Sequence, residues 1–320
     1  MTKCSFGFVG LRLAASFAEA GAEISLLVRE APIAGLRDRP VHVSGLLGDH
    51  VIRAGQVEIS DAAAPDDRIL GSDMLIVTTK AYDVAEALRP FAGYADQPAL
   101  LMLQNGLGSA EIARDVMGPD APVYSTAMMI GMVRNAPNDV AVTAQSSPIL
   151  CGPLLGDDPE PLERMLDVAT KGFVPMVLDP SIRETVAFKL LFNSSMNPTG
   201  AMTGQTYGEL LENAHSRAFI TGLADETLAA FAAAYDYRPA RDGRQHVEEI
   251  LWPIIFPRSQ GHRSSMLQDL EAGRKTEIDF LNGAIVRLAE GEGLTATRHE
   301  SVRALVLARE KALSGDGDGR

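Results

Sequence analysis

The chain has 320 residues, 46% of them hydrophobic and 22% charged, which is typical of a soluble globular protein with room for two domains. Its formal net charge of -13 argues against nucleic acid and anionic membrane surfaces as partners, because both require a basic surface. The two cysteines, Cys4 and Cys151, lie outside any C-x-x-C pattern. The sequence therefore predicts no disulfide framework and no metal site.

The sequence offers no signal for a membrane or for secretion. No apolar run reaches the roughly 18 residues that a membrane span requires. The first 22 residues contain a lysine, an apolar stretch and small residues, as a signal peptide does, but Arg12 interrupts the apolar stretch and Glu19 follows it. We therefore expect a cytoplasmic protein.

The first half of the chain alternates between helical and strand-like patterns. A helical pattern that ends at a glycine is followed by an apolar run rich in β-branched and leucine residues, and two further strand patterns are each followed by a helical one. The helical pattern covers Leu11–Gly21, and the strand patterns cover Glu23–Arg29, Asp73–Lys80 and Pro98–Gly106. This alternation predicts a parallel α/β sheet.

The pattern changes twice along the rest of the chain. Beyond about residue 120, strand-like segments follow one another through turns, which suggests an antiparallel extension of the sheet, and from about Ser181 the pattern is helical almost throughout. We therefore predict a Rossmann-type α/β domain over residues 1–180 and an all-α domain over residues 181–312. The polar, glycine-rich segment 313–320 is predicted to be a disordered tail.

A candidate dinucleotide-binding turn lies at the N-terminus. The stretch "SFGFVG" places Gly7 and Gly10 at the second and third positions of a G-x-G-x-x-G turn, while Ser5 occupies the first. A tight strand-to-helix turn without a ligand would look the same. Arg29 ends the next strand, where an arginine favours the 2′-phosphate of NADP, although Glu30 is adjacent and a solvated strand end would also explain Arg29.

The stretch "FKLLFNSSMNP" carries one cation and two amides among apolar residues. Lys189, Asn193 and Asn197 are four residues apart, so on a helix they form one stripe, and Pro198 predicts that the helix ends or kinks at Asn197. A solvated polar stripe is the alternative. Asparagine, however, is a poor helix former, and Lys189 has no acidic residue four positions away. A partly buried lysine has a lowered pKa, which suits it to donate a proton.

Other polar residues stand at strand ends or in a later helical segment. Lys80 and Asn105 each follow an apolar strand, and ligands of open parallel sheets bind beyond such strand ends. Asn105 precedes a glycine and could equally serve a plain turn. In the segment 262–283, Ser265 and Glu277 are further candidates, but Glu277 could belong to a solvated charged face.

With these segments in place, the chain resembles the ketopantoate reductase family. The resemblance rests on "FAEAGAEISLLVR", "TTKAYD", "LQNGLG", "FKLLFNSSMNPTGA" and "SSMLQDLEAGRKTEID", which occur in the family's order from about residue 7 to 310. It implies NADPH-dependent reduction of a 2-oxo acid, 2-dehydropantoate, to the 2-hydroxy acid, as in pantothenate biosynthesis. The implied site lies between a Rossmann-type domain and a helical domain, and a homodimer is compatible with it.

The resemblance also implies roles for the residues that match the family's motifs. Lys189 would be the general acid, Asn193 and Asn197 would hold the substrate, and Ser265 would bind its carboxylate side. Glu277 would lie beside the substrate hydroxyl and the cofactor ribose.

On the cofactor side, the resemblance implies that Asn105 orients the nicotinamide and the substrate, with Lys80 near the cofactor. Gly7 and Gly10 match the phosphate turn. Tyr207 stands where ketopantoate-specific members tend to have another amide. Two alternatives follow: a paralogous reductase of a different 2-oxo acid or ketone, and a non-catalytic member that has lost cofactor binding through the change in the "SFGFVG" turn.

Overall fold

The chain has two kinds of architecture in succession, first an α/β part and then a helical part. A computed structural model describes residues 2–5, 8–28, 39–94, 97–136, 138–145, 147–156, 158–257 and 259–313. The contacts divide the chain into two units: the first holds the residues up to Gln104 and Ser109–Val186, and the second holds Asn105–Gly108 and the residues from Ala187 onward. The predicted boundary after residue 180 and the predicted tail from 313 remain predictions, and residues 314–320 lie outside the described ranges.

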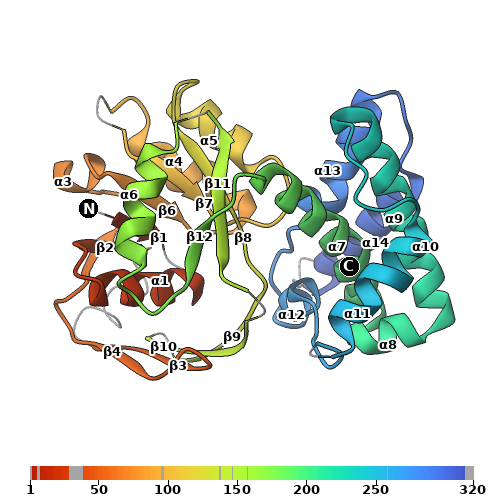
Figure 1. Cartoon of the computed structure of the whole chain (residues 1–320), viewed down its shortest axis with the longest axis horizontal. Helices are drawn as coiled ribbons and strands as arrows, with labels where there is room; N and C mark the ends of the chain where they lie inside the picture. The colour runs from red at the N-terminus through yellow and green to blue at the C-terminus, as the bar shows by residue number, and fades with distance from the viewer. Residues whose placement is uncertain are drawn as a thin grey trace, which may run out of the picture. The chain divides into compact units, whose positions relative to one another are not determined.

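The first unit is built on a large, mostly parallel sheet (Figure 1). Among the described residues it has eight strands, in the order β12 (Met176–Leu178), β11 (Ile149–Leu155), β8 (Val123–Ala127), β7 (Ala99–Met102), β6 (Met74–Val77), β1 (Thr2–Ser5), β2 (Ile24–Val28) and β5 (Glu58–Asp61). All neighbours from β5 to β8 are parallel. The order β5-β2-β1-β6-β7-β8 is that of a doubly wound dinucleotide-binding sheet, which confirms the predicted Rossmann-type fold.

Helices cover both faces of this sheet. Within one strand, successive apolar side chains point to opposite faces, so Leu26 packs with α1 (Phe8–Glu19) and α6 (Glu160–Ala169). Its neighbour Leu27 packs instead with α3 (Asp67–Leu70), α4 (Val84–Leu88) and α5 (Ser109–Met117). Two-sided burial explains why these strands read as continuous apolar runs. Strand β1 has only four residues, yet it pairs with both β2 and β6.

A second sheet corrects one prediction. The strands beyond residue 120 do not all extend the main sheet, because β9 (Ile130–Ala136) and β10 (Asp139–Gln145) pair with β3 (Val41–Gly45) and β4 (His50–Ile52) in a separate sheet. Only β11 adds an antiparallel neighbour, to β8. Parallel pairing of β10 with β3 brings Val140 opposite Val43 and buries both valines in the core that α1 shares.

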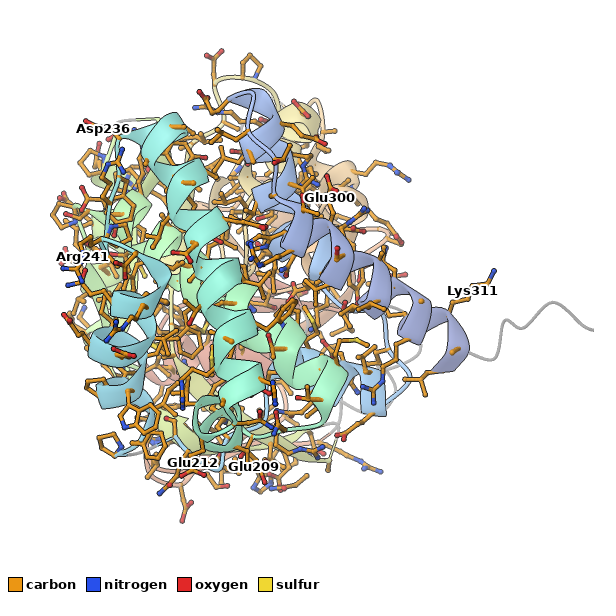
Figure 2. The ribbon with its side chains drawn as sticks, turned by 90° about the vertical axis from the view of Figure 1, so that its right-hand side faces the viewer. Glu209, Glu212, Asp236, Arg241, Glu300 and Lys311 are labelled. Carbon is orange, nitrogen blue, oxygen red and sulfur yellow. The ribbon has the colours of Figure 1, made fainter. Side chains whose placement is uncertain are left out.

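The second unit is helical, as predicted. Its helices are α7 (Ile182–Thr203), which begins in the first unit, α8 (Tyr207–Glu212), α9 (Ala214–Tyr235), α10 (Gly243–Gln245), the π-helical η3 (His246–Leu251), α11 (Trp252–Ile255), α12 (Ser265–Glu271), α13 (Ile278–Gly291) and α14 (Thr297–Leu313). Figure 2 shows α9 and α14 at the surface, with Glu300 and Lys311 on the exposed side of α14. Helix α7 lies between two apolar clusters, one with α9 and α13 and one with α8 and η3.

The described part of the chain contains neither a candidate membrane-spanning helix nor a cluster of potential metal ligands. None of its described helices combines the length and apolar character needed to cross a membrane. Nor do three or more His, Cys, Asp or Glu side chains of the described ranges come together as metal ligands would.

Candidate active site

The polar stripe of α7 is buried, not solvated. Asn193 and Asn197 are 8% and 3% exposed, and Lys189, one turn before Asn193, is half-buried. The apolar residues between them belong to the clusters on either side of the helix. Burying polar groups costs free energy, so a stripe of two buried amides and a half-buried lysine on one helix indicates a site.

Helix α7 continues through Pro198, so it does not end at Asn197, which was one of the two predicted outcomes. The helix runs to Thr203, so Asn197 lies within it. A proline has no N–H, so the carbonyl of Ser194, four residues earlier, loses its usual helical partner. The side chain of Asn282 on α13 donates from Nδ2 to this carbonyl at 2.9 Å. The second unit thus supplies from another helix the hydrogen bond that the proline removes.

Lys189 has the electrostatic surroundings of a proton donor. Burial lowers the pKa of its ammonium from the usual 10.5 to about 8, and the carboxylate of Glu277 acts in the opposite direction. Glu277 is only 7% exposed, whereas the neighbouring Glu271, Arg274 and Lys275 are exposed. Glu277 therefore does not belong to the solvated charged face that its sequence neighbours form.

Asn105 meets Glu277 through a tight loop. The Asn105 Nδ2 atom donates to Oε2 of Glu277 at 3.4 Å. The loop is held in place because the backbone N–H of Leu107 donates to the carbonyl of Phe280 at 3.0 Å. Gly106 has a φ of +90°, and a Cβ at this position would clash with the same Phe280 carbonyl. The Asn-Gly pair is therefore a turn, and the turn also places the Asn105 amide beside Glu277.

Asn197 is held by residues that follow it in the chain. Its Oδ1 accepts a hydrogen bond from the hydroxyl of Tyr207 at 2.9 Å, and its backbone carbonyl accepts one from Ser264 at 3.3 Å. The ring of Tyr207 lies against His262, with ring centroids 5.1 Å apart. The sequence identified Tyr207 only as a departure from the family pattern, and it identified neither Ser264 nor His262.

The two serines before α12 have different environments. Ser264 is fully buried and caps α12, because its Oγ accepts from the N–H of Leu267 at 3.1 Å. Ser265, the residue that the resemblance selects, is exposed and begins the helix. The sequence alone does not show which of two adjacent serines is buried, so it could not distinguish Ser264 from Ser265.

The predicted cofactor residues belong to the first unit. Gly10 lies in the first turn of α1, Lys80 comes three residues after β6, and Gly7 and Arg29 lie outside the described residues. Among the described residues, no hydrogen bond joins Lys80 to Gly10.

Four polar side chains of the first unit, none of them predicted as site residues, have buried atoms without a hydrogen-bond partner among the described residues. They are Thr79 after β6, Gln104 after β7, Arg12 in α1 and Arg114 in α5. Gln104 Nε2 donates to the carbonyls of Val77 and Thr79, at 2.9 and 3.0 Å, but its Oε1 accepts from no described group. Arg12 is fully buried, and burial lowers its pKa to about 10, which leaves it charged at neutral pH.

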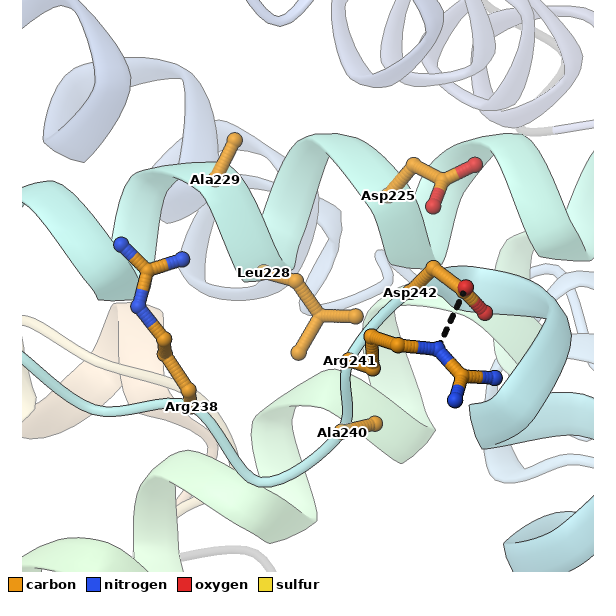
Figure 3. A pocket seen from close by; sticks show the side chains of 7 residues that line it. All are labelled: Asp225, Leu228, Ala229, Arg238, Ala240, Arg241 and Asp242. Carbon is orange, nitrogen blue, oxygen red and sulfur yellow. Dashed lines mark hydrogen bonds and ion pairs between the residues drawn. The ribbon is translucent and has the colours of Figure 1, made fainter.

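A hollow elsewhere on the second unit shares no residue with these sites. It is lined by α9 and the segment that follows that helix, and Arg241 pairs with Asp242 at its edge (Figure 3). Asp225 in the same hollow already accepts from the N–H of Gly243 at 2.6 Å. Arg241, Asp242 and Asp225 are therefore already engaged within the chain.

Comparisons with known proteins identify a family that spans most of the chain. Residues 6–156 match the family described as ketopantoate reductase PanE/ApbA, and residues 181–310 match its C-terminal part. The 2-dehydropantoate 2-reductase of Aquifex aeolicus is 26% identical over 95% of this chain and 94% of that protein. The one of Archaeoglobus fulgidus is 27% identical over 96% of each.

Solved structures share the whole fold at lower identity. A PanE/ApbA family ketopantoate reductase from Ralstonia eutropha has a TM-score of 0.82 at 22% identity, covering 98% of this chain and 99% of its own. D-mandelate dehydrogenase with NADH and anilino(oxo)acetate has a TM-score of 0.83 at 20% identity, with the same coverage. From the two family matches together with the conserved order of sheet and helices, the chain belongs to the ketopantoate reductase family, a family of oxidoreductases.

Proposed function

We propose that the chain reduces a 2-oxo acid to the 2-hydroxy acid with NADPH, and that the substrate is 2-dehydropantoate, as in pantothenate biosynthesis. The observation that carries this proposal is the stripe on α7, where a desolvated lysine beside a carboxylate shares one helix with two buried amides. The names of the curated relatives support the same reaction.

Lys189 would act as the general acid. Reduction of a ketone builds negative charge on the carbonyl oxygen, and an ammonium group stabilises that charge and supplies the proton. A pKa of about 8 makes Lys189 a better donor than an ordinary lysine. The Glu277 carboxylate would keep the ammonium protonated at neutral pH, since its charge favours the cationic form.

The amides and the hydroxyl would bind the substrate. The side chain of Asn193 makes no hydrogen bond to another described residue, and the side chain of Asn197 uses only its Oδ1, so both side chains have N–H donors available for an acceptor oxygen. Ser265 is exposed at the start of α12 and would take the carboxylate side. Asn105, hydrogen-bonded to Glu277, would orient the carbonyl end and the nicotinamide.

The first unit has side chains that fit a dinucleotide. Gly7, Gly10, Arg29 and Lys80 are the proposed cofactor residues, with Asn105 and Glu277 from the second unit. Buried polar atoms of Thr79, Gln104 and Arg12 without chain partners are what a bound phosphate, ribose or amide would satisfy. When bound, the nicotinamide supplies the hydride, and the chain provides position and charge.

The first experiment is a fluorescence titration of the purified chain with NADPH and, in parallel, with NADH. We expect tighter binding of NADPH, and we expect Arg29→Ala to abolish most of that preference, about tenfold or more. Turnover of 2-dehydropantoate, followed at the nicotinamide absorbance band, then tests the reaction. Failure to bind either cofactor would favour the non-catalytic alternative, and an unchanged preference in the variant would remove Arg29 from the cofactor site.

A second candidate is reduction of a bulkier 2-oxo acid. The specific observation is that the Tyr207 ring and the His262 ring lie in contact beside Asn197, where a hydroxylated substrate would gain from another amide. A solved relative with the same fold, D-mandelate dehydrogenase, carries anilino(oxo)acetate, which has an aromatic ring. Comparison of kcat/KM for 2-dehydropantoate and phenylglyoxylate separates the two candidates.

A further inference from the structure

Tyr207 uses its only polar side-chain atom on the amide of Asn197. The phenol oxygen donates to Asn197 Oδ1 at 2.9 Å, and both residues are buried, at 7% and 3% exposure. Burial also raises the pKa of Tyr207 above its usual value, so the hydroxyl keeps its proton at any working pH. The hydroxyl therefore remains a donor, and its hydrogen bond joins the start of α8 to the polar stripe of α7.

The Tyr207 ring is fixed from several sides. Its backbone N–H donates to the carbonyl of His262 at 2.9 Å, and its ring packs edge-on against Phe192, with centroids 5.5 Å apart, and against His262. The preceding Thr206 forms a capping box with Glu209, which fixes where α8 begins. The phenol thus has little freedom to move away from Asn197.

An asparagine amide can turn by 180° and exchange its oxygen for its nitrogen, which reverses what it offers to a ligand. The hydroxyl of Tyr207 favours the orientation in which Oδ1 faces α8. Nδ2 makes no hydrogen bond to another described residue, so its two N–H groups remain for an external acceptor. The backbone carbonyl of Asn197 is separately held by Ser264, which limits movement of the whole residue.

We propose that Tyr207 is a positioning residue that turns the Asn197 amide so that its N–H donors face an acceptor oxygen of the 2-oxo acid. This inference rests on the proposed function of the same site. Tyr207 acts through Asn197 and offers no hydrogen bond of its own to the substrate.

The test begins with Tyr207→Phe, which removes the hydroxyl and keeps both ring contacts. We expect the KM for 2-dehydropantoate to rise about 5- to 30-fold, the effect of one misplaced hydrogen bond, with kcat and the Kd for NADPH within about twofold of the wild type. Tyr124→Phe is the matched control, because it also removes a buried phenol hydrogen bond, to the carbonyl of Asp158 at 2.6 Å. Its KM should not change, and equal increases in KM for both variants would overturn the proposal.

A double-mutant cycle separates positioning from a direct or purely structural role. If Tyr207 acts only through Asn197, the variant Asn197→Ala should have the same KM with and without Tyr207→Phe. Additive effects would contradict the proposal. Asn197→Asp gives an independent check, since the aspartate can still accept from Tyr207 but has no N–H donors, and a wild-type KM in this variant would also overturn it.

Binding measurements distinguish failure of this inference from failure of the proposed function. The Kd for 2-dehydropantoate is measured by calorimetry with NADP⁺ present, where no reduction can occur. If the wild type binds the oxo acid but does not reduce it, the reductase function fails, while weaker binding by Tyr207→Phe still supports the positioning role. If the wild type does not bind the oxo acid at all, both proposals fail.

Discussion

The two units of the chain differ in how they treat their buried charges. In the second unit, Lys189 has the carboxylate of Glu277 as a counter-charge, and Glu277 itself accepts from Asn105. In the first unit, the guanidinium of Arg12 is fully buried, yet no described residue hydrogen-bonds to it. The helical unit has a charge-balanced polar site, whereas the α/β unit buries a cation without a counter-charge among the described residues.

This difference indicates what kind of ligand would suit each unit. An unpaired buried charge costs several kcal/mol, so it persists where an anion relieves it in the working state. The α/β unit is therefore suited to a strongly anionic ligand such as a dinucleotide. In the helical unit the charges already balance, so the substrate needs to supply only hydrogen-bond acceptors and a developing negative charge.

The largest effect on activity is expected from removing the ammonium group of Lys189 in the helical unit. Lys189→Ala should lower kcat by about 10²- to 10⁴-fold, the usual contribution of a positioned general acid, while the Kd for NADPH stays near the wild-type value. Steady-state kinetics and cofactor titration measure the two quantities. Lys171→Ala, at an exposed position of the first unit, is the control. A Lys189 variant with near wild-type kcat would exclude the general-acid role.

Removing the guanidinium of Arg12 in the α/β unit should change cofactor affinity and thermal stability instead. Arg12→Met should weaken NADPH binding about tenfold or more, because a charge-assisted contact to an anion is lost, yet it should raise the Tm of the cofactor-free chain by relieving an unpaired charge. Thermal unfolding with and without NADPH measures both effects. A lower Tm combined with unchanged affinity would show that Arg12 has a purely structural partner, and the contrast between the units would not hold.

The pH dependence tests the balance between Lys189 and Glu277. A proton donor must be protonated, so kcat/KM should be constant below a pH of about 8 and fall as the pH rises through the pKa of Lys189. The Glu277 carboxylate raises that pKa, so Glu277→Gln should move the fall in kcat/KM to lower pH, in addition to any loss of rate. A shift to higher pH in the variant would contradict the assignment of Lys189 as the titrating group.

The smallest expected effect concerns the support of α7. Asn282→Leu removes the donor to the Ser194 carbonyl, which Pro198 cannot replace, and should lower the free energy of unfolding by about 1 to 3 kcal/mol. In the Pro198→Ala background the same substitution should cost less, because the backbone N–H restored at position 198 can donate to that carbonyl. Denaturant titration of the four proteins gives the coupling, and equal losses in both backgrounds would exclude this explanation.

Much of the fold could be predicted because it depends on local pattern. The alternation of apolar runs and amphipathic segments identified strands such as β2, β6 and β7 and the long helices. The sheet of β3, β4, β9 and β10 was missed because its pairing joins residues about 100 positions apart, for example Val43 with Val140. Periodicity within a segment carries no information about such a distant partner.

By itself, the sequence determined the stripe of Lys189, Asn193 and Asn197, because a spacing of four places side chains on one face of a helix. Only the tertiary structure decided that α7 passes through Pro198, since the replacement donor, Asn282, comes from another helix. It also decided that Tyr207 bonds to Asn197 and that Glu277 is buried while its neighbours are exposed. Burial and side-chain pairing arise when distant segments pack, and no local pattern specifies them.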